Sequence, residues 1–208
     1  MNVVGKRSDR SNSEHLRTLI AKEAARIIRE HGIEGYHSAK GKAAVNLGLS
    51  NHGALPNNRE IEQALAEHNR IFGGNQHQHL LVNLRSVALS VMYNLRLFHP
   101  CLVGSVLSGN ITEHSTIKLH LFSDASENVS VRLLEQGIRH RTTLRRHRMR
   151  PNYLEDFPGY RFFAVECTID TTVFPERTKA HAPLSPVDGK PMQRAKLRDV
   201  ELLAEAWP

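Results

Sequence analysis

The 208-residue sequence contains only two cysteines, Cys101 and Cys167. Two cysteines so far apart exclude a disulfide-stapled scaffold and a zinc site built mainly from thiolates. Both lie in apolar, strand-like surroundings, which predicts two reduced thiols in the core. No apolar run approaches the ~20 residues of a membrane-spanning helix, and the polar first residues lack the apolar core of a signal peptide. We therefore expect a cytoplasmic protein without a membrane partner.

Acidic residues are in the minority: 21 Asp and Glu stand against 28 Lys and Arg, which gives a formal net charge of +7. A basic surface favours partners that carry phosphate, either nucleotides or nucleic acid. Hydrophobic residues make up 40% of the chain, so it has enough apolar side chains for an ordered core and falls outside the disordered class.

Residues 1–74 show helical periodicity and no strand pattern, which predicts an N-terminal helical region. Its expected helices cover Ser11–Gly32, Ser38–Leu47, and a stretch from Asn57 or Asn58 to Phe72. Gly73 and Gly74 then interrupt the helical pattern. A further helix is expected over His79–Phe98, where Pro100 ends it.

Residues 75–208 form the second predicted domain, in which strands and helices mix. Apolar or alternating patterns predict strands over Cys101–Val106, Thr116–Phe122, Ile138–Arg150 and Phe162–Phe174. A helix from Asp124 to Gly137 and a last helix over Leu197–Trp207 accompany them. This order of elements predicts an α+β fold with a helical N-terminal region.

The stretch LVGSVLSGNITEHSTIKLHLF, residues 102–122, carries the most specific functional signal. Gly104 lets the backbone approach a ligand closely, and Ser105 adds a hydroxyl. Successive backbone N–H groups there can bind a triphosphate, and Gly109 keeps the turn open. On the next strand, Lys118 and His120 share a polar side with Thr116. We therefore expect ligand contacts from the residues Gly104, Ser105, Gly109, Lys118 and His120.

This arrangement resembles the nucleotidyltransferase superfamily, in which Gly-Ser is followed after about ten residues by Asp-x-Asp on the next strand. The resemblance implies a mixed sheet with flanking helices, a nucleoside triphosphate and Mg²⁺ ions held by the aspartates. In this chain ten residues follow Ser105, so the two aspartate positions fall on Thr116 and Lys118. Threonine is a weak, neutral ligand and a lysine ammonium repels a cation. The metal site is therefore expected to be degraded.

A second resemblance covers most of the chain. The sequence is similar to a group of small bacterial proteins that share this stretch and a tail like APLSPVDGKPMQRA, residues 182–195. That similarity implies no particular activity.

The resemblance also implies a third carboxylate on a later strand. Asp170 is the best match and Glu166 is the next, since both fall on one face of the expected strand. Three interpretations stay open: the acids are simply solvated, they act as unusual metal ligands together with Glu113, or Asp170 pairs with Lys118 where a metal ion would lie.

A basic segment, IRHRTTLRRHRMR at residues 138–150, holds six arginines and no acid. As a strand it places Arg139, Arg141 and Arg145 on one side and Arg146 and Arg148 on the other. This pattern is typical of an edge strand protected by charge, and it also suits a rim that binds phosphate or nucleic acid. The histidines His77, His79, His114 and His120 match no zinc spacing.

Three functions follow as hypotheses. The first is a nucleotidyltransferase-like protein with a degraded metal site that binds a nucleotide or phosphate and acts as a regulatory module. The second is an active transferase of nucleotidyl (AMP) groups that uses non-standard carboxylates. The third is a basic protein that binds nucleic acid through the arginine segment and the N-terminal helices, whose sequence has a loose helix-turn-helix pattern.

Overall fold

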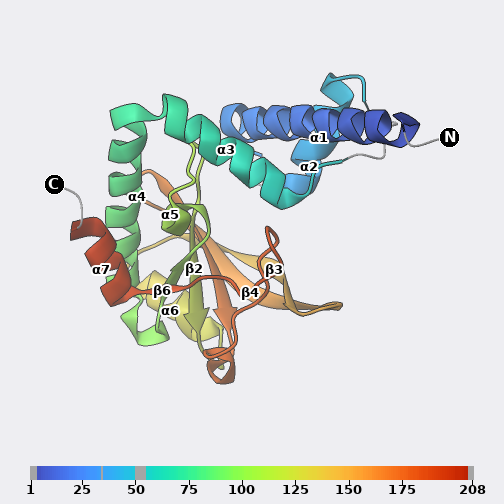
Figure 1. Ribbon diagram of the computed structural model, residues 1–208. Helices are drawn as coiled ribbons and strands as arrows, with labels where there is room; N and C mark the ends of the chain where they lie inside the picture. Colours follow the sequence, from blue (N-terminus) through green and yellow to red (C-terminus); the bar gives the residue numbers. More distant parts are fainter. Residues whose placement is uncertain (1–3, 34, 50–54, 206–208) are drawn as a thin grey trace. The chain divides into compact units, whose positions relative to one another are not determined.

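The computed structural model describes residues 4–33, 35–49 and 55–205 (Figure 1). The chain divides into two compact units. The first extends to Gly74 and includes the short segment Thr112–His114, and the second comprises Asn75–Ile111 and the chain from Ser115 onward. No helix among the described residues is long and apolar enough to cross a membrane.

The first unit consists of helices α1 (Val4–His31), α2 (Tyr36–Asn46) and α3 (Asn58–Phe72). Its core joins Ile20, Ala24 and Ile27 of α1 to alanines of α2 and to Ile61 of α3. Small side chains on α2 let the helix backbones approach closely. Helix α3 begins with a capping box, in which the Asn57 side chain accepts the backbone N–H of Glu60 and the Glu60 carboxylate accepts the N–H of Asn57.

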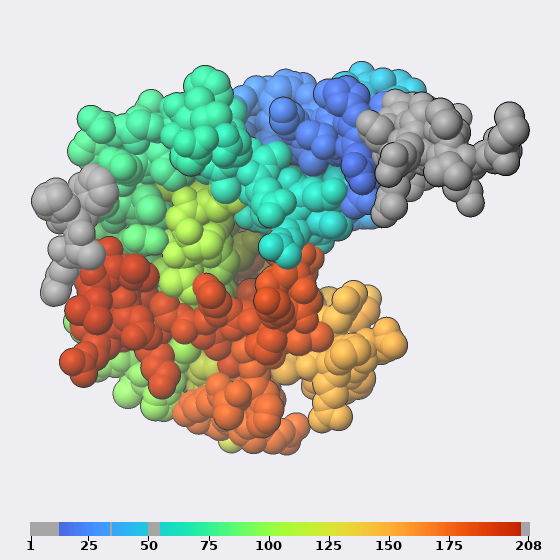
Figure 2. Space-filling model, in the orientation of Figure 1, coloured from blue at the N-terminus to red at the C-terminus, as the bar shows by residue number. Residues whose placement is uncertain are grey.

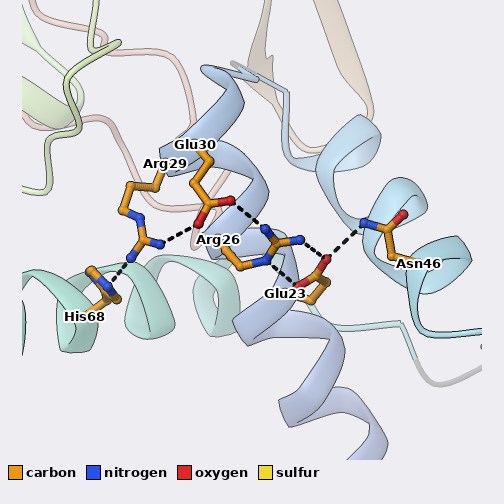
Figure 3. A network of polar contacts seen from close by, with 6 residues as sticks. All are labelled: Glu23, Arg26, Arg29, Glu30, Asn46 and His68. Atoms are coloured by element: carbon orange, nitrogen blue, oxygen red, sulfur yellow. Dashed lines mark hydrogen bonds and ion pairs between the residues drawn. The ribbon is translucent and has the colours of Figure 1, made fainter.

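Polar contacts add to this packing (Figure 3). The network consists of six residues: Glu23, Arg26, Arg29, Glu30, Asn46 and His68. The Arg26 guanidinium donates to Glu23 at 2.8 and 2.7 Å and to Glu30 at 2.5 Å. Asn46 of α2 also donates to Glu23, at 3.0 Å, and Arg29 contacts His68 of α3. The network therefore links α1 to both of its neighbours.

The second unit begins with helix α4 (Gly74–Asn94) and η1 (Arg96–Phe98). Its strands are β1 (Cys101–Val103), β2 (Ile117–Phe122), β3 (His140–Arg150), β4 (Tyr153–Ala164), β5 (Cys167–Phe174) and β6 (Ala195–Lys196). Between them lie α5 (Ser105–Ser108), α6 (Glu127–Glu135) and η2 (Glu176–Thr178), and the last described element is α7 (Leu197–Glu205). The predicted α+β class is confirmed: helices precede a six-stranded mixed sheet with order β3-β4-β5-β2-β1-β6. Among the strands of the described residues, β2 and β5 form the only parallel pair.

The two faces of this sheet differ in chemistry. On one face Leu119, Leu121, Ile169 and Val173 pack against apolar residues of α4, α6 and α7 in a single core. Because side chains alternate along a strand, the intervening residues of β2 and β5 point to the opposite face. Those residues are Lys118, His120 and Phe122 on β2, and Asp170, Thr172 and Phe174 on β5. This second face, called the polar face below, carries the candidate site.

The single strand predicted over Phe162–Phe174 is wrong, because a tight hairpin divides it. Strand β4 ends at Ala164, β5 begins at Cys167, and those two residues form the last antiparallel pair. Val165 and Glu166 between them have φ angles of 47° and 64°, as in a type I′ turn. A β-branched residue is rare in this conformation, so the sequence carries none of the usual glycine or asparagine signals of such a turn.

Other expected boundaries shift by smaller amounts. Helix α1 begins at Val4 rather than at Ser11, and the predicted strand Cys101–Val106 ends at Val103, where the one-turn helix α5 follows. The predicted end of the last helix at Trp207 lies outside the described residues. The expectation of two free thiols is confirmed, with Cys101 buried and Cys167 half-buried.

Regular pairing of β4 with β5 ends at Arg161–Asp170, and beyond it Gly159 passes close to the backbone of β5. A Cβ atom on Gly159 would lie 1.9 Å from the carbonyl oxygen of Thr171, so only glycine fits. Beyond the pair Arg161–Asp170, the Thr171 hydroxyl bonds to both the N–H and the carbonyl of Tyr160, at 2.9 and 3.0 Å. The last regular pair on this side of the hairpin is therefore the one that contains Asp170.

Candidate functional site

The Gly-Ser turn begins where β1 ends. Gly104 has φ 76° and ψ −151°, a conformation essentially restricted to glycine, and it precedes α5. A Cβ atom on Gly104 would lie 3.6 Å from Cδ of Lys118, so the lysine side chain runs beside the exposed turn. The structure therefore brings the predicted residues Gly104, Ser105 and Lys118 together. Gly109 closes the other end of α5 and lies against Leu81 of α4.

Lys118 belongs to a row of charged residues that crosses four strands of the polar face. Lys118 on β2 is the direct partner of Asp170 on β5, and Asp170 is the direct partner of Arg161 on β4. Arg161 in turn is opposite Arg141 on β3. Direct partners on neighbouring strands project to the same face, so we call these four residues the charged row.

Asp170 is the only acid of the charged row, and it is buried, with 6% of its side chain exposed. Its Oδ2 accepts from Nη2 of Arg161 at 3.0 Å. Arg145, farther along β3, donates from Nε to Oδ1 at 3.3 Å and also from Nη2 to Oδ2. The expectation that Asp170 is a solvated acid is therefore wrong, and its ion-pair partners are these two arginines rather than the expected Lys118.

Positive side chains gather around Asp170. Lys118 lies beside it on β2, and Arg145 and Arg161 both pair with its carboxylate. The Arg145 and Arg161 side chains are 32% and 19% exposed, and Nε of Arg161 is buried. Arg141 at the end of the row is also exposed. The polar face therefore presents a concentration of N–H donors suited to an anion.

The residues present do not fit the Mg²⁺ site that the family resemblance implies. Both oxygens of Asp170 already accept from guanidinium groups, and Lys118 occupies one of the aspartate positions. Glu166 lies exposed in the β4–β5 turn, away from the strand position predicted for it. Glu113 is exposed in the segment grouped with the first unit. Within the described part of the chain, no three His, Cys, Asp or Glu residues are arranged to hold a metal.

His120, expected to contact ligand, is instead buried, with 2% exposed. Its Nδ1 accepts a hydrogen bond of 3.0 Å from Nε of Arg194, so this nitrogen is unprotonated. Burial, assisted by the charge of Arg194 and by His147, holds the pKa of His120 well below its usual value. Arg194 also stacks over Phe122 and Phe174, at 5.0 and 5.3 Å from the ring centroids. No sequence pattern predicts this contact, because 74 residues separate Arg194 from His120.

His147 of β3 completes this cluster. Its Nε2 lies 3.3 Å from the Thr172 hydroxyl, and its ring meets that of His120 edge-on at 5.5 Å. Burial, with the charges of Arg194 and Arg145, lowers the pKa of His147 to about 4. Both histidines are therefore neutral near pH 7. The cluster is a structural support beside the charged row rather than part of a ligand surface.

The arginine segment is an edge strand, as predicted. Its residues alternate between faces, so Arg141 and Arg145 turn to the polar face while Arg146 and Arg148 turn to the other. Arg146 pairs with Asp156 at 2.7 Å, and Arg139 precedes the strand. The tail also reaches this edge, where the N–H of Leu184 donates to the carbonyl of Arg148 at 2.7 Å. Figure 2 shows the segment before α7, coloured red, on the surface of this unit.

Substitution of Asp170 by asparagine is expected to destabilise the protein, because it leaves Arg145 and Arg161 without their charge partner. We expect the free energy of unfolding to fall by about 1–3 kcal/mol, as for a lost charge-assisted hydrogen-bond pair that is partly screened by solvent. Urea denaturation measures this loss. The matched change Asp156→Asn breaks an exposed pair and should alter stability little. Equal effects of both substitutions would contradict the structural role of Asp170.

Stability should fall as the pH is lowered from about 6.5 towards 4. His147 and His120 have depressed pKa values in the folded state, so the unfolded chain binds protons first. Each histidine then contributes a slope of at most about 1.4 kcal/mol per pH unit, and the stability present above pH 6.5 is lost in this window. Urea denaturation between pH 6.5 and 5 tests this before most carboxylates titrate.

The matched variants separate buried from exposed histidines. His147→Gln should flatten the pH slope because it removes one of the titrating groups. His181→Gln, at an exposed position in the tail, should leave the slope unchanged. A slope that His147→Gln does not reduce would show that other groups cause the acid sensitivity.

Comparison of the chain with protein-family models, with curated protein sequences and with solved structures found no match. Neither family nor function therefore follows from similarity, and the geometry of the polar face is the basis for what is proposed next.

Proposed function

We propose that the charged row and the adjacent Gly104–Ser105 turn bind the phosphates of a nucleotide without a divalent metal ion. The protein would then be a nucleotidyltransferase-like binding or regulatory module rather than a metal-dependent transferase. The observation that carries this proposal is the placement of Lys118 between the turn and Asp170, at a position where the related enzymes place a metal-binding aspartate.

The charge of the site supports an anionic ligand. Lys118 is a compact point charge on a flexible stem, while Arg161 and Arg145 offer planar N–H donors already oriented by Asp170. In such an arrangement the carboxylate positions the guanidinium groups, and Lys118 and the exposed Arg141 add positive charge that attracts a phosphate. A lysine ammonium then supplies the positive charge that metal ions supply in the enzymes.

The alternative of an active transferase has little support from the side chains. In-line attack on a nucleotide phosphorus needs carboxylates that hold metal ions, and Asp170 alone, bound by two arginines, does not form such a set. The nucleic-acid alternative is weakened because the arginines of β3 are divided between the two faces of the sheet and do not form one basic surface. The charged row is large enough to contact the phosphates of a mononucleotide or a free phosphate group.

Titration with ATP in the presence of EDTA tests the proposal. We expect ATP to bind without Mg²⁺, and Lys118→Ala to weaken binding about 10-fold or more, the value of one charge-assisted hydrogen bond. Isothermal titration calorimetry gives the dissociation constants. Arg198→Ala is the control, because it removes an equal charge from an exposed position on α7.

Two results would contradict the proposal. One is an absence of ATP binding in EDTA. The other is binding that appears only with Mg²⁺ and that Lys118→Ala leaves unchanged, since this would indicate a metal site elsewhere on the protein.

A further inference from the structure

Phe163 is an aromatic ring in an exposed position beside the charged row. It lies on β4 with 73% of its surface exposed, although burial of a phenylalanine side chain is worth roughly 1.5–3 kcal/mol. None of the hydrophobic clusters of the described residues includes it. The fold therefore places a large apolar side chain in solvent without using it for packing.

Strand register fixes the face on which this ring lies. Phe163 follows Arg161 by two residues, and its direct partner is Thr168, just as the partner of Arg161 is Asp170. Side chains two apart on a strand share a face, so Phe163 projects from the same polar face as the charged row. The two Cα atoms are separated by about 7 Å along the strand.

We infer that Phe163 is a stacking platform for the base of a nucleotide whose phosphates contact Lys118 and Arg161. This inference rests on the proposed function and adds a recognition element for the base. A ribose can span the separation between an aromatic ring and a phosphate-binding cation two residues away. The ligand class is therefore a nucleoside phosphate rather than phosphate alone.

The chemistry of the surroundings favours a base over an apolar protein partner. Towards the turn, the ring is followed by the exposed Val165. In the other direction along β4, the next residue on the same face is Arg161, whose direct partner on β3 is Arg141. An apolar partner would have to desolvate these cations, whereas a nucleotide matches both parts, with its base on the ring and its phosphates on the cations. Every base has a π-face, so this contact accepts more than one base.

The experiment compares three ligands in EDTA: ATP, inorganic tripolyphosphate and adenosine. With the native protein, ATP should bind more tightly than tripolyphosphate, and adenosine should bind weakly because it lacks the charges. Phe163→Ala should weaken ATP binding by about 5- to 100-fold, the usual effect of losing one stacked base, and should leave tripolyphosphate binding unchanged. Phe163→Tyr should retain the affinity for ATP.

Tyr153→Ala provides a matched control. Tyr153 is also an exposed aromatic residue of β4, at the opposite end of the strand from Phe163. Its removal should change the affinity for neither ATP nor tripolyphosphate. Because both rings are exposed, neither substitution removes core packing, and circular dichroism verifies that each variant is folded.

The outcomes separate this inference from the proposed function. If tripolyphosphate binds but Phe163→Ala leaves the affinity for ATP unchanged, the stacking role is overturned while phosphate binding stands. If Phe163→Ala weakens both ligands equally, the ring supports the fold of the site and the stacking role is again overturned. If the native protein binds neither ATP nor tripolyphosphate, the proposed function itself fails.

Discussion

The contact on which the polar face depends is the one between the Asp170 carboxylate and the guanidinium groups of Arg145 and Arg161. It links β3, β4 and β5 at the place where β4 separates from β5. A buried carboxylate is costly without partners, and two arginines provide them. The same contact fixes the direction of both guanidinium groups. It also decides what the face can bind, because an acid already saturated by arginines is a poor ligand for a cation.

Lys118 lies beside this contact on β2, the strand that pairs in parallel with β5. Its neighbours are Asp170 on one side and the exposed turn at Gly104 on the other, so the ammonium group brings a further positive charge to this part of the polar face. Together these residues are the basis of the proposed anion-binding role of the polar face. Behind the row, His120 and His147 stay neutral around Arg194, which keeps that part of the sheet packed.

The sequence predicted much of the fold because most of its elements carry local signals. Alternation of apolar residues identified β2, charge identified β3 as an edge strand, and Asn57 marked the start of α3. The β4–β5 hairpin was missed, since Val165 and Glu166 are not turn residues, and that error placed Glu166 beside Asp170. Partners that come from distant parts of the chain have no local signal at all. Neither the contact of Arg161 with Asp170 nor that of Arg194 with His120 follows from spacing, which is why the expected Lys118–Asp170 pair and the ligand role of His120 were wrong.

The central claim is that the space around Asp170 accepts anions and not divalent cations. Addition of Mn²⁺ to the ¹⁵N-labelled protein tests it directly, because a bound paramagnetic ion broadens the amide resonances of nearby residues. The account predicts that Lys118, Asp170 and Arg161 show no more broadening than exposed residues elsewhere, such as Arg198. Selective loss of the Lys118 and Asp170 signals at low Mn²⁺ concentration would contradict it.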